Sequence, residues 1–102
     1  MDAYESSELL KSLTIKMDNI KNIVKPDVLE SRLAEIEQMQ QDPDFWNDTA
    51  NAGKVSQEKT KAERILATYN DANDAVHDAA EYFELSKAEN DEETLEMLYE
   101  DA

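Results

Sequence analysis

The residues most suited to chemistry lie around the single histidine of the chain. Their spacing places them on one face of a helix, and they are Asp74, His77, Asp78 and Glu81. Pairs of such carboxylate and histidine motifs on facing helices hold dinuclear metal centres in helical bundles. Because the sequence has only one histidine, no second motif of this kind can face the first. We therefore interpret this face as a solvated acidic surface and predict no bound metal.

A calcium loop and a catalytic centre are also disfavoured. The segment DANDAVHDAAEY has Val76 where a calcium loop requires Gly, and Tyr82 where the closing Glu belongs. The chain has no Cys, and His77 is its only histidine, the residue type used most often as a general acid or base. Catalysis needs a reactive group beside a partner that tunes it. We predict no catalytic residue, no cofactor and no enzyme activity for these residues.

A run of bases is the remaining candidate for a binding site. It comprises Lys54, Lys59, Lys61 and Arg64. Such a concentration of charge could contact phosphate, for example in RNA. Pairing with Glu58 and Glu63 is the simpler interpretation, because the spacing spreads the bases over more than one helical face. The run therefore stays a possible partner contact, as does the acidic stretch from Glu89 to Asp101, which could meet a basic partner.

Charge and composition limit the class of protein. The 102 residues carry a net charge of −15, of which residues 27–53 contribute seven acids and one base, and residues 89–102 seven acids and no base. Such a chain repels polyanions, so rRNA contact is not expected to dominate its binding. The absence of Cys fits a reducing interior, and neither a signal peptide nor a run of about 20 apolar residues is visible. We expect a soluble cytoplasmic protein without membrane contact.

Hydrophobic periodicity predicts helices throughout. One stripe recurs at steps of three and four over residues 4–24: Leu9, Leu13, Met17, Ile20 and Val24. Pro26 disfavours a helical Lys25 and suits the first turn of a new helix, which predicts a break followed at once by a second helix that ends near Gln41, before Pro43. With one Gly and two Pro in the chain, we predict an all-α fold, an antiparallel bundle of three to four helices.

Turn-forming residues gather in the segment QQDPDFWNDTANAG and predict a tight corner between helices. Its structural residues are Pro43, Phe45, Trp46 and Asn47. Asp48 could cap a short helix over residues 49–52, which a left-handed Gly53 would close. Because leaving a large ring in water is costly, we expect Trp46 to fold back as a buried plug on the bundle.

A long helix is predicted from Val55 to about Lys87. Its stripe consists of Val55, Ala62, Ile65 or Leu66, Tyr69, Ala72, Val76, Ala79 or Ala80, and Phe83. Asn90 or Asp91 could cap one more helix, with an apolar edge formed by Leu95, Leu98 and Tyr99. This last segment has no terminating Gly or Pro, which predicts a domain truncated at its C-terminal end.

Three segments together resemble one family. DPDFWND, the preceding EIEQMQQ and the later FELSKAENDEETLEMLYEDA are similar to the amino-terminal region of bacterial peptide chain release factor 2, a class I release factor. The resemblance implies that residues 1–102 are the amino-terminal helical domain of a factor for translation termination, which enters the ribosome, reads UGA or UAA and triggers hydrolysis of peptidyl-tRNA. Neither the Gly-Gly-Gln nor the Ser-Pro-Phe motif of that family occurs here, so the catalytic and codon-reading domains are absent.

The resemblance also implies partners. The family's first domain projects toward proteins at the stalk base of the large ribosomal subunit, and toward the GTPase release factor. A non-catalytic docking domain is the function we expect, with rRNA contact by these residues unlikely in view of their charge. The alternative from another class is a free-standing acidic helical adaptor or coiled-coil interaction protein, indicated by the charge and by the heptad-like stripes.

Overall fold

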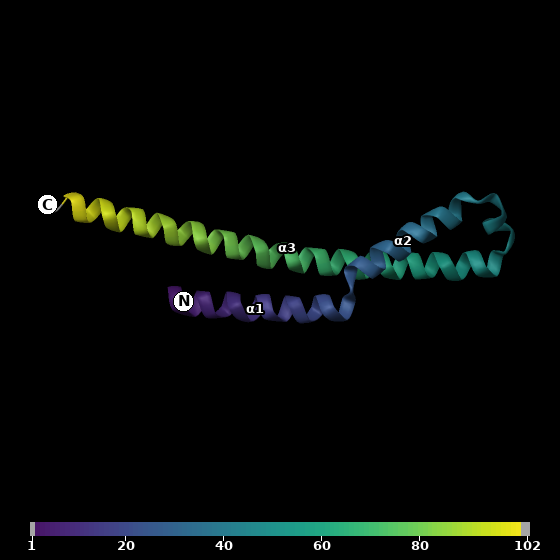
Figure 1. The fold of residues 1–102 in the computed structure, drawn as a ribbon, viewed down its shortest axis with the longest axis horizontal. Helices are drawn as coiled ribbons and strands as arrows, with labels where there is room; N and C mark the ends of the chain where they lie inside the picture. Colours follow the sequence, from purple (N-terminus) through teal and green to yellow (C-terminus); the bar gives the residue numbers. More distant parts are fainter. Residues whose placement is uncertain (1, 101–102) are drawn as a thin grey trace. The chain divides into compact units, whose positions relative to one another are not determined.

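A computed structural model describes the backbone of residues 2–100 and the side chains of residues 2–90. Helix α1 spans Ala3–Val24, α2 spans Pro26–Gln41, the 3-10 helix η1 spans Pro43–Asn47, and α3 spans Thr49–Glu100 (Figure 1). No strand occurs among the described residues. The all-α class is therefore confirmed, whereas the antiparallel bundle of three to four helices stays a prediction.

The break between α1 and α2 falls where the sequence predicts it. Lys25 has a left-handed backbone (φ 53°, ψ 65°), and Pro26 occupies the first turn of α2. A lysine in this region is strained, because its Cβ approaches the neighbouring carbonyl oxygen. Backbone hydrogen bonds hold it there: the Lys25 amide donates to the carbonyl of Lys21 (2.8 Å), and its own carbonyl accepts from the amide of Val28 (3.0 Å).

Helix α3 corrects two predictions about where helices begin and end. Asp48 caps its start, as expected, but the helix runs through Gly53, which has no positive φ and closes no short helix. One Gly costs a helix only about 1 kcal/mol, which the favourable residues around it offset. The helix is also unbroken at Asn90 and Asp91, so neither residue caps a separate segment. The predicted apolar edge of Leu95, Leu98 and Tyr99 lies outside the residues whose side chains are described.

The chain divides into two compact units, of which the first is Asp18–Ala72. Within it, α2 lies beside the first part of α3, and η1 reverses the chain between them, so the two helices are antiparallel (Figure 1). Ile36 of α2 is fully buried. The buried residues of α3 recur at steps of three, seven, four and three: Ala52, Val55, Ala62, Leu66 and Tyr69. Because the step of seven spans two turns, this spacing averages about 3.5 residues per turn, which keeps one seam of a helix against its neighbour.

The second unit combines the first 17 residues with the chain from Asn73 onward. Met17 is its buried residue among those described, and Leu10 and Leu13 of α1 are half-buried. On α3 the stripe continues through half-buried Asn73 and not through Ala72, which is exposed, so that part of the prediction is wrong. Leu9 and Ile20, both predicted for the buried stripe, are also exposed, at 47% and 41%. No helix in the described part of the chain is long and apolar enough to cross a membrane.

Candidate functional site

The corner between α2 and α3 is built from short-range hydrogen bonds to aspartates. The Asp42 carboxylate accepts from the amide of Asp44 (3.0 Å), and Pro43 begins η1 with a fixed φ. At the other end, the Asp48 carboxylate accepts from the amide of Asn51 (3.1 Å) and caps α3. Between them, the Asn47 side-chain amide donates to the Asp44 carboxylate (3.4 Å). Asp42 and Asp48 thus hold the backbone that follows each of them, and Asn47 and Asp44 pair through their side chains.

Trp46 lies on the outside of this corner. Its side chain is 52% exposed, so the predicted buried plug is wrong. The ring is nevertheless fixed, because its Nε1–H donates to the carbonyl oxygen of Gln40 (3.0 Å) at the end of α2. The half-buried ring of Phe45 meets it edge to face, with centroids 5.0 Å apart and planes at 88°. A 3-10 helix of five residues has no wide apolar face to bury two adjacent rings, so Phe45 takes the inner position.

Gln40 connects the corner to α3 through its side chain as well. Its Oε1 accepts from Nζ of Lys59 (3.4 Å), and the same ammonium lies 4.0 Å from Oε1 of Glu63. Lys59 and Glu63 therefore form the intrahelical pair that the sequence predicts. The contact with Gln40 directs Lys59 toward α2, away from the other bases of its run.

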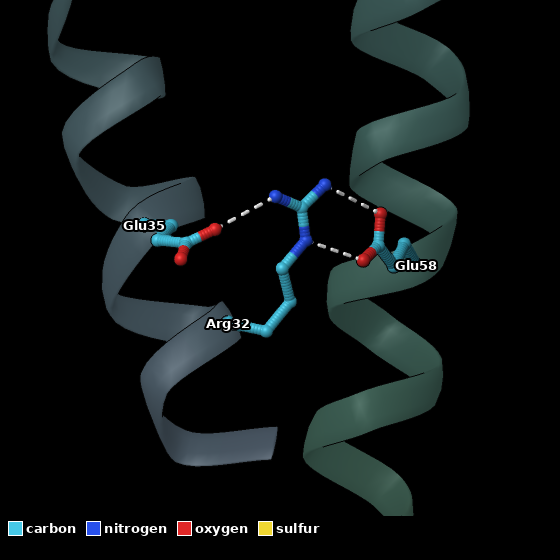
Figure 2. A network of polar contacts seen from close by, with 3 residues as sticks. All are labelled: Arg32, Glu35 and Glu58. Carbon is cyan, nitrogen blue, oxygen red and sulfur yellow. Dashed lines mark hydrogen bonds and ion pairs between the residues drawn. The ribbon is translucent and has the colours of Figure 1, made fainter. Parts of the chain in front are cut away.

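An interhelical ion pair that the sequence analysis missed lies farther along the hairpin (Figure 2). The guanidinium of Arg32 on α2 donates from Nε to Glu58 Oε1 (2.6 Å) and from Nη2 to Glu58 Oε2 (3.1 Å). Its Nη1 donates to Oε2 of Glu35 on the same helix (3.1 Å). These bonds raise the pKa of Arg32 and lower the pKa of Glu58 below its ordinary value of 4.5, chiefly because each partner hydrogen-bonds the charged form of the other.

The expected pairing of Glu58 with the basic run is thus wrong. The sequence does contain a signal for the observed pair, because Arg32 is the only base between Lys25 and Lys54. A planar guanidinium can bond one carboxylate with two parallel donors, whereas a lysine acts as a point charge, so Arg32 is the better partner for a carboxylate on a neighbouring helix.

The basic run itself is not one surface. Lys61 and Arg64 line a shallow hollow of α3 with three polar neighbours, Ser56, Gln57 and Thr60. Lys54 is exposed, and Lys59 faces Gln40. The run is therefore divided between two faces of α3, and partner contact by it stays a prediction.

All four residues of the acidic face around His77 are exposed: Asp74, His77, Asp78 and Glu81. Among the residues with described side chains, no group of three or more His, Cys, Asp and Glu residues could hold a metal ion. The arrangement offers no convergent donors for a cofactor. What the described residues provide is a helical hairpin whose tip is held by side-chain hydrogen bonds and is partly apolar and strongly acidic.

Comparison with known proteins decides the family. Residues 29–102 match the model of the PCRF domain. This chain belongs to the PCRF domain family. The matched segment begins inside α2, so α1 and the first turn of α2 precede the matched part of the PCRF domain.

Three similar relatives of this PCRF domain carry the same name. Peptide chain release factor 2 of Sulfurovum sp. is 76% identical over 102 residues, the same factor of Campylobacter concisus 58%, and that of Nitratiruptor sp. 52%. In each case the match covers 100% of this chain and 28% of the relative. The chain thus spans less than a third of the length of these relatives. No solved structure gives a significant match.

Proposed function

We propose that this chain is the amino-terminal docking domain of a bacterial peptide chain release factor 2 and acts in translation termination at UGA and UAA codons. The observation that supports the proposal most strongly is the 76% identity to a peptide chain release factor 2 over all 102 residues. A free-standing acidic adaptor is the weaker alternative, because each of these relatives is a much longer protein that carries the matched segment as about 28% of its length.

The role we assign to the domain is docking, and the chemistry of peptide release belongs to other parts of the factor. A Gly-Gly-Gln motif needs two adjacent glycines, whereas this sequence has the single Gly53. Without Cys, and with an exposed His77 as its one histidine, the chain has few groups that could act as a nucleophile or a general base. The domain contributes binding energy and orientation.

The partner of the domain is the ribosome in the cytoplasm, met through basic ribosomal proteins at the stalk base, with the GTPase release factor as a second partner. The charge of −15 supports a protein partner over rRNA, because phosphates would be repelled and exposed lysines and arginines attracted. In the complete factor, we infer that the helical hairpin is part of an antiparallel bundle of three to four helices, since apolar side chains such as Ile15 and Leu85 are largely exposed on this chain.

A deletion in the complete factor tests this proposal. Removing residues 2–102 is expected to raise the factor concentration for half-maximal peptide release on stop-codon-programmed ribosomes by at least about tenfold, while the maximal rate changes less than about threefold. A large change in the half-maximal concentration with a small change in the maximal rate would assign binding to this domain and peptide release to other parts of the factor. A collapse of the maximal rate at an unchanged half-maximal concentration would contradict it.

A further inference from the structure

We propose that the corner at residues 42–48 is the contact surface of this domain, and that its partner is a basic protein surface that covers the indole of Trp46. The inference rests on the proposed docking function and goes beyond it by naming the surface and the chemistry that recognises it. We call this surface the acidic tryptophan corner; it consists of Asp42, Asp44, Trp46 and Asp48.

The state of Trp46 is the first reason. Trp46, the largest side chain of the protein, is 52% exposed. It is nevertheless held in place by the hydrogen bond to Gln40 and the edge contact with Phe45. An exposed ring that is already ordered loses little conformational entropy when a partner covers it. Tryptophan is also among the residues that dominate binding energy at protein interfaces. Trp46 therefore has the properties of a preformed anchor.

The charge around the ring is the second reason, and it selects the partner. Residues 33–53 contain five acidic residues and no base. The cations on the adjoining part of α3 are Lys54, which is exposed, and Lys59, which is engaged by Gln40 and Glu63. Phosphates would be repelled by such a surface, which argues against RNA. Lysines and arginines of a protein would be attracted, and an arginine could also stack on the indole face.

The hydrogen bonds of the corner allow its charge to be removed without loss of its fold. Asp42 and Asp48 each use one carboxylate oxygen as a backbone cap. Asparagine keeps that acceptor and is an equally good cap, so Asp42→Asn, Asp44→Asn and Asp48→Asn together remove three negative charges at the corner with the caps retained. Trp46→Ala removes the anchor, and Tyr4→Ala, at a residue that is 74% exposed on α1, is the matched control for loss of a surface aromatic.

The experiment measures the dissociation constant of the complete factor for stop-codon-programmed ribosomes. Trp46→Ala and the triple Asp→Asn variant are each expected to raise Kd by at least about tenfold, and Tyr4→Ala by less than about twofold. Circular dichroism of each variant establishes that the helices are retained. The triple variant should in addition weaken the dependence of Kd on salt concentration, because fewer opposite charges are paired in the complex.

Two other outcomes separate the inference from the proposed function. If deletion of residues 2–102 raises Kd but Trp46→Ala and the triple variant leave it within about twofold of the unchanged factor, the domain docks through another surface and the inference is overturned. If the deletion leaves Kd unchanged, the docking function and the inference are both overturned. A triple Asp→Asn variant that binds more tightly would identify RNA as the partner, since relief of phosphate repulsion would then dominate.

Discussion

Individual side chains on the α2–α3 hairpin differ sharply in how much of the fold depends on them. Ile36 and Val28 are both β-branched residues of α2, but Ile36 is fully buried whereas Val28 is 61% exposed. Truncation of a buried aliphatic side chain removes its transfer free energy and leaves a cavity, while truncation of a mostly exposed one removes little buried area. The hairpin therefore depends on Ile36 far more than on Val28.

Ile36→Ala is expected to lower the free energy of unfolding by about 2 to 5 kcal/mol, and Val28→Ala by less than about 0.5 kcal/mol. Urea unfolding followed by circular dichroism measures both. Equal losses for the two variants would mean that α2 does not face α3 through Ile36.

Trp46→Ala is expected to lower the free energy of unfolding by less than about 1.5 kcal/mol, since it removes one hydrogen bond and a partly exposed ring. The same urea titration measures this value. A loss of about 3 to 5 kcal/mol is typical of a buried ring and would show that Trp46 is the buried plug expected from the sequence. The small value expected here leaves the indole available for a partner.

At the scale of elements, local sequence chemistry predicts where helices stop but not which residues meet across them. Pro26 and Pro43 limit helices on their own, and Asp48 caps the next residues in the chain, so these features are readable from the sequence. The Arg32–Glu58 pair requires the register of α2 against α3, which no spacing within one helix contains. The exposure of Trp46 likewise depends on how the corner closes. The chemistry of the corner was thus predictable, and its orientation was not.

A substitution at Gly53 distinguishes a continuous helix α3 from a short helix that ends at Gly53. A Cβ added there would meet no atom within 4 Å, and the residue has helical backbone angles. Gly53→Ala is therefore expected to stabilise the chain by about 0.5 to 1 kcal/mol in thermal or urea unfolding. Had Gly53 closed a short helix in the left-handed conformation, alanine would instead be strained and the variant less stable.

The Arg32–Glu58 pair predicts a dependence of stability on pH. Because the pKa of Glu58 is lower in the folded chain than its ordinary value of 4.5, the pair contributes its full stabilisation above about that pH and loses it as the pH falls through the folded pKa. Glu58→Gln should therefore be less stable than the unchanged chain near neutrality, and the difference should shrink below pH 4.5.

Urea midpoints measured between pH 3 and 7 test this, a range that spans the ordinary carboxyl pKa values of about 4. Glu30→Gln, at an exposed carboxylate of α2, is the charge-matched control. A Glu58→Gln difference that stays constant across the range would show that the ion pair does not stabilise the hairpin.

For the whole molecule, the distribution of charge and the family assignment lead to the same role. A PCRF domain with a charge of −15 and a sequence 76% identical to a peptide chain release factor 2 is suited to meet basic protein surface on a particle made largely of RNA. Under the proposed function, the remaining length of such a factor supplies the affinity for RNA, because this acidic domain opposes it. Under the same proposal, the domain then selects where the factor docks.

Photo-crosslinking from the acidic tryptophan corner tests this role most directly. A photoreactive phenylalanine analogue replaces Trp46 in the complete factor, which is bound to stop-codon-programmed ribosomes and irradiated, with the analogue at Tyr4 as the control position. The account predicts crosslinks from position 46 to a lysine- or arginine-rich ribosomal protein, and few from position 4. Crosslinks from position 46 to rRNA alone, or none from that position while the factor is bound, would contradict it.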